Sequence, residues 1–183
     1  VFLRSSMAHG VIRSLDVSEA RAAPGVHLVL TADDLVAAGV RMDMKAERVK
    51  NRDGSRGAHP ERPVLARDRV RFVGEAMALV VAETLSQARD AVEMIEFDID
   101  PLPAHVDTAV GGPQVHDDVP ENVALDFGLG DKAAVDAAIA GAAHVVRLRI
   151  PDNRVIVASM EARGVTAMME EGRLHVAVSA QGV

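Results

Sequence analysis

Apolar and polar positions in the first hundred residues change period several times, and each change predicts a new element. Residues 9–15 and 26–30 are strand-like stretches separated by a helical turn. A buried strand is predicted over residues 77–82, all of which are apolar. Residues 88–100 first place Ala, Val and Ile at helical spacing and then alternate as a strand does. The pattern therefore predicts two strand–helix–strand units in a mixed α/β domain, residues 1–103.

Polar side chains mark where the predicted helices begin and end. Ser18 is expected to cap a short helical turn, and Thr31 to cap the next helix, which Gly39 ends. Thr84 and Gln87 have the spacing of a capping box at the start of the helix that follows. Each such cap stabilises its helix by about 1 kcal/mol.

The rest of the chain changes character twice. Residues 41–63 lack periodicity and hold Asn, Asp and Gly, so an exposed loop is predicted there. Residues 104–143 form a connector with one helix, residues 132–142, capped by Asp131. A second unit, residues 144–183, is predicted to be built of antiparallel strands. Its predicted strands are residues 144–150, 155–160, 165–169 and 173–180.

Both ends of the chain have the composition of a strand interior. The first residues, Val1-Phe2-Leu3, are apolar and include no initiating Met, and the last predicted strand runs to Ala180. The second unit would stop before it could close a core. We therefore expect a fragment of a longer protein that is inactive on its own.

Composition and charge exclude several classes of function. The chain has 183 residues, of which 49% are hydrophobic, so a folded core is expected. Its net charge of −7 and its 2% aromatic content argue against binding nucleic acid by phosphate contacts or base stacking. It has no Cys, so it can hold no disulfide, thiolate metal site or iron–sulfur cluster. No apolar run reaches the length of a membrane span.

A glycine motif in the connector has the outline of a dinucleotide-binding fingerprint. Gly128-Leu129-Gly130 follows a strand-like stretch, residues 122–127, and opens a helix, and Asp152 lies about where a ribose-binding acid would follow. However, Asp126 interrupts the strand, and Asp131 lies where the pyrophosphate would bind. A capped helix therefore explains the motif better than a dinucleotide-binding module does.

The remaining candidate residues are explained as well by structure as by chemistry. The seven His residues form no pair at metal-ligand spacing, and the acidic turn at His116 lacks the spaced ligands of a calcium loop. Glu161 and Arg163 lie two apart before Gly164, as in an ion pair at a bend. Gln181 follows an alternating strand, and can either project its amide into a cavity or simply end that strand.

Short segments along nearly the whole chain have an order and spacing that are specific only when taken together. They are Arg4-Ser5, Ala8-His9, Ile12-Arg13-Ser14-Leu15-Asp16, Pro24-Gly25-Val26, Val29-Leu30-Thr31, Asp34-Leu35, Pro63-Val64-Leu65-Ala66, Val70-Arg71-Phe72-Val73-Gly74-Glu75, Val80-Val81-Ala82-Glu83-Thr84, Ala88, Pro101-Leu102-Pro103, Asn153-Arg154-Val155, Met160-Glu161, Arg163-Gly164 and Gln181. This series resembles the molybdenum-binding large subunit of the xanthine dehydrogenase and aldehyde oxidase enzymes, which includes the large chain of aerobic carbon monoxide dehydrogenase. The sequence departs from the family pattern at Met7, Ala76, Ser159, Ala162 and Ala180.

The resemblance implies a fold and an activity. The fold class would be α+β: an α/β hammerhead domain over residues 1–103, then the start of an antiparallel molybdopterin-binding domain, residues 144–183. Enzymes of this family oxidise an aldehyde, an N-heterocycle or a similar small substrate with oxygen from water. The full-length protein would bind molybdopterin, and the fragment alone none. The competing interpretation is a non-catalytic binding or scaffold module with a hammerhead fold.

The resemblance also implies partners and a site residue. The partners would be the remainder of the large subunit, iron–sulfur and FAD subunits or domains, and a small-molecule substrate, in the cytoplasm. Gln181 matches the glutamine whose amide binds the apical oxygen of molybdenum. The family's catalytic glutamate and glycine-rich loop would lie beyond Val183, so neither a catalytic residue nor a metal ligand is expected here.

Overall fold

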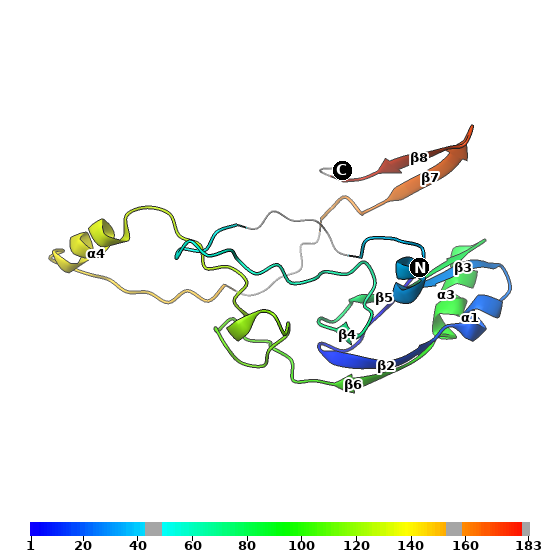
Figure 1. The fold of residues 1–183 in the computed structure, drawn as a ribbon, viewed down its shortest axis with the longest axis horizontal. Coiled ribbons are helices and arrows are strands. Elements are labelled where there is room, and N and C mark those ends of the chain that lie inside the picture. The colour runs from blue at the N-terminus through cyan, green and yellow to red at the C-terminus, as the bar shows by residue number, and fades with distance from the viewer. Residues whose placement is uncertain (43–48, 153–158, 181–183) are drawn as a thin grey trace. The chain divides into compact units, whose positions relative to one another are not determined.

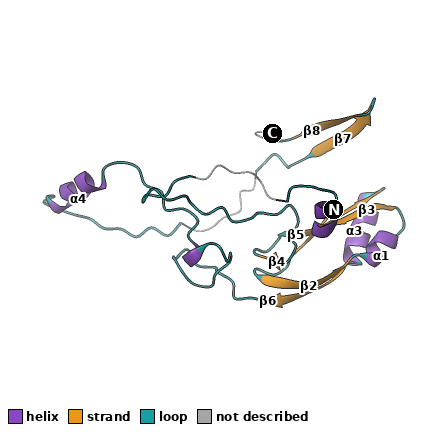
Figure 2. Ribbon diagram, viewed as in Figure 1, coloured by secondary structure: helices purple, strands orange, loops and turns teal. Residues whose placement is uncertain are grey.

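The computed structural model describes residues 1–42, 49–152 and 159–180, and two units separate within it (Figure 1). The first unit is Val1–Val145 and the second is Val146–Val183. Helices and strands are both present, and all the paired strands are antiparallel (Figure 2). The predicted mixed α/β fold is thus confirmed.

One sheet of the first unit has β5 (Ala76–Ala82) at its centre, flanked by β1 (Phe2–Arg4) and β3 (Val26–Thr31). The apolar run predicted as a buried strand is therefore a central strand, and Met77 and Val80 are fully buried in it. The prediction that both faces are buried throughout is wrong in part, since Val81 is 41% exposed and Leu79 and Ala82 are only half-buried.

The other sheet of the first unit has β2 (Gly10–Asp16) at its centre, between β4 (Arg69–Val70) and β6 (Glu96–Pro101). Each strand–helix–strand segment of the first unit places its two strands in different sheets. One segment runs from β2 through α1 (Ser18–Ala22) to β3, and the other from β5 through α3 (Leu85–Glu93) to β6. The strands of the two segments pair with each other, β2 with β6 and β3 with β5.

The core of the first unit lies where α1 and α3 meet the sheets, and it is built of small aliphatic side chains. Ala20 and Ala91, one from each helix, are fully buried, which lets the two helices approach closely. Val70 from β4 and Ile99 from β6 belong to the same cluster. This packing explains how a chain with few aromatic residues closes a core.

The helix caps follow the sequence predictions with two exceptions. The capping box predicted at Thr84 and Gln87 is only half formed, because the Gln87 side chain accepts from the Thr84 hydroxyl at 2.8 Å and not from the Thr84 N–H. Thr31 and Asp34 form a full capping box at the start of α2 (Ala32–Ala37), and the Thr84 hydroxyl accepts from the N–H of Gln87 at 3.2 Å. Ser18 is not a cap, however. It is the first residue of α1, and its own N–H donates to the Asp16 carboxylate at 2.9 Å. The Asp16 carboxylate is therefore the side chain that accepts a hydrogen bond from a backbone N–H at the start of α1.

Part of the predicted loop at residues 41–63 is hydrogen-bonded to the connector. Residues 49–59 fold back on themselves and bond to residues 122–127, which form no strand of either sheet. Arg52 N–H donates to the Asp126 carbonyl at 2.7 Å, and Ala58 N–H to the Ala124 carbonyl at 2.8 Å. Residues 122–127, although strand-like in sequence, thus form no strand, because their backbone bonds to the loop instead.

The rest of the connector holds a short 3-10 helix, η1 (Pro120–Asn122), and α4 (Lys132–Ala140), slightly shorter than predicted. In the second unit β7 (Val165–Glu170) and β8 (Arg173–Val178) form a hairpin at the predicted place. Two further strands were predicted there. Residues 144–150 are not a strand, and most of residues 155–160 lies outside the described residues.

Among the described residues no helix is long and apolar enough to cross a membrane.

Candidate functional site

Further hydrogen bonds hold the hairpin of the second unit together at the end opposite its turn. Ser179 directly follows β8, and its N–H donates to the Gly164 carbonyl at 3.0 Å. Its hydroxyl donates to the Glu161 carboxylate at 2.6 Å. A hydroxyl bonded to an ionised carboxylate is a strong hydrogen bond. Glu161 is thus held by Ser179, and not by the pairing with Arg163 that their spacing suggested.

Gln181, the predicted cofactor contact, lies outside the described residues. Its assignment therefore stays a prediction. Ser179 lies two residues before it in the sequence, so the Glu161–Ser179 bond fastens the chain shortly before that position. The sequence did not predict this bond. Ser179 and Gln181 are two residues apart in one alternating stretch of the sequence, but that spacing says nothing of Glu161.

Three polar residues are buried in the described part of the first unit, residues 1–42 and 49–145, and two of them are titratable. His9 is 4% exposed and Glu75 is 6% exposed. The His9 Nδ1 donates to the Pro103 carbonyl at 2.9 Å, and its buried Nε2 has no partner among the residues that the structure describes. The Glu75 carboxylate accepts from the Arg71 N–H at 2.5 Å. Burial raises the pKa of Glu75, against the opposing effect of the hydrogen bond from Arg71 and of that residue's charge.

His116 joins this group from the connector. Burial and the charge of Arg71 lower the pKa of His116, and weaker effects of His9 and Arg69 act in the same direction. Asp118 acts in the opposite direction. His9, Glu75 and His116 are far apart in the sequence, so no local motif could have revealed that the charge of His9 acts on both other residues.

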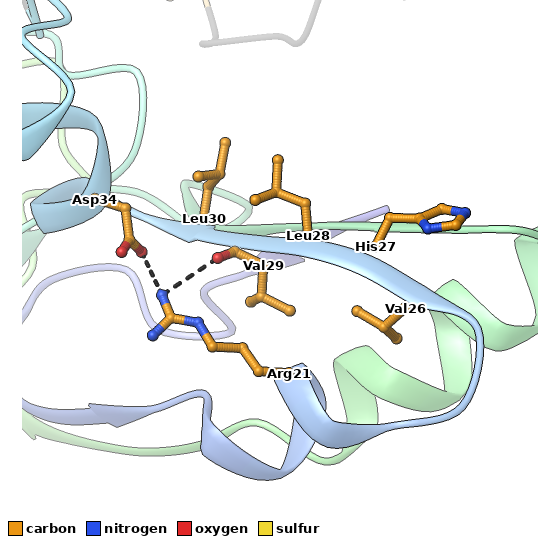
Figure 3. A pocket seen from close by; sticks show the side chains of 7 residues that line it. All are labelled: Arg21, Val26, His27, Leu28, Val29, Leu30 and Asp34. Carbon is orange, nitrogen blue, oxygen red and sulfur yellow. Dashed lines mark hydrogen bonds and ion pairs between the residues drawn. The ribbon is translucent and has the colours of Figure 1, made fainter.

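A surface hollow of about 370 Å³ follows the edge strand β3 (Figure 3). The Arg21 guanidinium points from α1 toward this edge, donating to the Asp34 carboxylate at 2.7 Å and to the Val29 carbonyl at 3.3 Å. Both contacts are made within the domain. Arg21 therefore covers an open strand edge, the place where a sheet is prone to pair with other chains.

The glycine motif at residues 128–130 leads into a capped helix. The Asp131 carboxylate accepts from the Ala134 N–H at 3.0 Å and so occupies the start of α4. Asp126 is paired with Arg52 at 3.1 Å. The Asp131 carboxylate at the helix start disfavours a pyrophosphate there, so the dinucleotide interpretation finds no support in the geometry.

The chemistry of the available donors limits the kinds of cofactor that could bind. Within residues 1–42, 49–152 and 159–180, no group of three or more His, Cys, Asp or Glu side chains could hold a metal ion. Glu161 and Ser179 offer hydrogen-bonding groups instead.

Two family models match consecutive parts of the chain. Residues 1–103 match the a/b hammerhead domain of aldehyde oxidase and xanthine dehydrogenase. Residues 115–183 match the molybdopterin cofactor-binding domain.

Individual relatives match over almost the whole chain. The nicotine 6-hydroxylase large subunit of Paenarthrobacter nicotinovorans is 37% identical, over 98% of this chain and 22% of that protein. The carbon monoxide dehydrogenase large chain of Afipia carboxidovorans is 32% identical, over 93% of this chain and 22% of that protein. This chain thus spans about a fifth of the length of these relatives.

Solved structures give the same result. Quinoline 2-oxidoreductase from Pseudomonas putida 86 matches with a TM-score of 0.78 and 30% identity, over 99% of this chain and 23% of that one. The Cu,Mo-CO dehydrogenase matches with a TM-score of 0.75 and 31% identity, over 96% of this chain and 23% of that one. The chain belongs to the aldehyde oxidase and xanthine dehydrogenase family, and it carries the hammerhead domain of that family.

Proposed function

We propose that this chain is part of the large subunit of a molybdenum-dependent hydroxylase, which oxidises an N-heterocycle, an aldehyde or a similar small substrate. The observation that carries the proposal is the match of the hammerhead and molybdopterin-binding models, in this order, along one chain. Nicotine and quinoline, which appear in the names of two relatives, are both N-heterocycles. Heterocycles are therefore the substrates to test first.

Molybdopterin is the proposed cofactor, with the Gln181 amide as one of its contacts. When bound, the cofactor supplies the redox chemistry, while the protein supplies orientation and hydrogen bonds. Glu161 contributes indirectly, because its bond to Ser179 fastens the chain two residues before Gln181. The absence of a metal-ligand group among the described residues is compatible with a metal held by the cofactor itself.

The proposed partners are the remainder of the large subunit, iron–sulfur and FAD subunits or domains, and the small-molecule substrate. Two relatives are named as a large subunit and as the gamma subunit of a dehydrogenase complex, which supports an assembly of several chains. The proposed location is the cytoplasm, on the strength of the family resemblance. Residues 1–103, 104–143 and 144–183 are proposed as hammerhead domain, connector and start of the cofactor-binding domain.

The test uses the complete large subunit assembled with its partners. We expect one molybdenum per large subunit by metal analysis, and oxidation of a pyridine- or quinoline-type substrate in ¹⁸O-labelled water that transfers the label to the product. The 183-residue chain alone should bind no molybdenum and show no activity. A complete protein without molybdenum or pterin would contradict the proposal and favour the scaffold module.

A further inference from the structure

Residues 49–59, which we call the strap, fold back on themselves through backbone hydrogen bonds. The Asn51 N–H donates to the Ser55 carbonyl at 2.8 Å, and the Gly57 N–H donates to the Val49 carbonyl at 2.9 Å. Both bonds join residues within the strap, so they give this segment a turn-like shape of its own. The outer groups of the strap are then available for contacts with another segment.

A second set of hydrogen bonds joins the strap to residues 124–128 of the connector. The Arg52 N–H donates to the Asp126 carbonyl at 2.7 Å, and the Asp126 N–H donates in return to the Asn51 side-chain oxygen at 3.0 Å. The Arg52 guanidinium adds bonds to the Asp126 carboxylate at 3.1 Å and to the Phe127 carbonyl at 3.3 Å. Donors thus come from both segments, which are far apart in the sequence.

Two glycines lie at the closest approaches between the strap and the connector. A Cβ at Gly57 would lie 3.1 Å from the Ala124 carbonyl oxygen and 3.2 Å from the Leu125 side chain. A Cβ at Gly128 would lie 2.9 Å from Nε of Arg52. Neither glycine has a positive φ, so the backbone conformation requires glycine at neither position. The close contact between the two segments is therefore the structural reason for both.

The strap and the connector segment belong to different family regions. The strap lies within residues 1–103, which match the hammerhead domain, and residues 124–128 lie within residues 115–183, which match the molybdopterin-binding domain. Both segments are part of the first unit. We propose that the strap closes over residues 124–128 and opens as one unit, so that the first part of the cofactor-binding region stays attached to the hammerhead region only while the strap is closed. This proposal does not depend on the activity proposed above.

The ion pair between Arg52 and Asp126 is only a small part of this attachment. Both side chains are more than half exposed, 54% for Arg52 and 65% for Asp126, and exposed ion pairs are weak. The backbone bonds and the close approach at Gly57 therefore contribute most of it. Because these contacts depend on one relative position of the two segments, they form and break together.

Hydrogen exchange on the intact protein, resolved to single amides, measures whether the strap opens as one unit. The amides of Arg52 and Ala58 in the strap and of Asp126 in the connector should have protection factors that agree within about threefold, because one opening exposes all three. Protection factors that differ by more than about tenfold would overturn the proposal. So would an Asp126 amide that exchanges at its intrinsic rate.

Gly57→Val forces the two segments apart from the side of the strap. The new side chain would meet the Ala124 carbonyl oxygen, a backbone atom that yields only when the connector moves, so protection of Ala58 and Asp126 should fall together by about tenfold. Gly164→Val is the matched control, because a Cβ there meets no atom and its φ is not positive, and it should leave both amides unchanged. A fall at Ala58 without one at Asp126 would contradict the strap.

Arg52→Ala tests the attachment without adding any bulk. It removes the guanidinium bonds to the connector and keeps the backbone N–H, so protection of Ala58 and Asp126 should fall by the same factor, about two- to fivefold. Arg56→Ala changes a strap arginine whose side chain makes none of the bonds to the connector in the described residues, and should change neither amide. If Arg52→Ala leaves both amides unchanged, or Arg56→Ala lowers them equally, the proposal is wrong.

Discussion

The hammerhead domain and the β7–β8 hairpin both contain antiparallel paired strands, but their side chains have opposite environments. In the hammerhead domain Met77, Val70 and Val80 are completely buried. In the hairpin Met169 is 71% exposed and Leu174 is 64% exposed, although six residue pairs are in register. The comparison separates two sources of order, apolar burial in the first region and local backbone bonding in the second.

These sources of order differ in what they contribute to the free energy of unfolding. Complete burial of a large aliphatic side chain contributes about 1.5–3 kcal/mol, and an isolated two-stranded hairpin is marginally stable in water. We therefore expect global unfolding of this chain to report on the hammerhead domain. The hairpin should depend on apolar surfaces supplied by other parts of the complete protein.

The largest expected effect comes from emptying the core. Met77→Ala removes a fully buried side chain at the centre of β5, and should lower the free energy of unfolding by about 2–5 kcal/mol. The matched variant Leu174→Ala, in the exposed hairpin, should change it by less than about 0.5 kcal/mol. Urea denaturation followed by far-UV circular dichroism measures both. Similar losses for the two variants would show that the hairpin is part of the cooperative core.

Local signals in the sequence were enough to predict much of this domain. Thr31, Asp131 and the buried run at residues 77–82 act through neighbours within a few positions, and the structure has them where the sequence placed them. The partition of each strand–helix–strand unit between two sheets was not predictable in this way. It depends on which strands pair at long range, and the apolar pattern is the same for either arrangement.

The candidate site was less predictable than the fold for the same reason. The charge of His9 acts on both Glu75 and His116, although the three residues are far apart in the sequence, so no local pattern pointed to them. The Ser179–Glu161 bond joins residues on either side of the hairpin. The role of Gln181 depends on the family resemblance and not on any pattern of spacing.

A smaller effect is expected from helix caps within the hammerhead domain. Thr31→Ala removes the hydroxyl of the capping box of α2, and should cost about 1 kcal/mol. Ser86→Ala, within the first turn of α3 and not at its cap, should change the free energy of unfolding by only a few tenths of a kcal/mol, because Ala is the better helix former. Thermal unfolding of the two variants measures the difference. Equal effects would mean that α2 is held by its packing alone.

The buried carboxylate of Glu75 makes the stability of the hammerhead domain depend on pH. Because burial raises the pKa of Glu75, its folded form binds more protons above pH 4.5 than its unfolded form, and its contribution to stability is lost as the pH rises through that range. Glu75→Gln should remove this pH dependence. The stability at neutral pH should change by less than about 1 kcal/mol, since relief of the buried charge is offset by lost attraction to Arg71.

The control for this variant is Glu83→Gln, which replaces an exposed carboxylate just after β5. Denaturation midpoints measured from about pH 4.5 to pH 7.5 should flatten for Glu75→Gln and keep the wild-type slope for Glu83→Gln. A wild-type slope in Glu75→Gln would show that the carboxylate is charged and well solvated in the folded protein.

The smallest effect on global unfolding is expected where the hairpin turns. Glu171 and Gly172 have φ angles of 49° and 77°, as a tight hairpin turn requires, and a Cβ at Gly172 would meet no other atom. Gly172→Ala therefore adds backbone strain alone, on the order of 1–3 kcal/mol, and should raise hydrogen exchange in β7 and β8. Gly164→Ala, which also meets no atom and has no positive φ, is the matched control. Because the hairpin contributes no buried core in the described residues, the global denaturation midpoint should stay unchanged in both variants. A shift of that midpoint with Gly172→Ala would contradict the separation between a domain held by burial and a hairpin held by its own backbone.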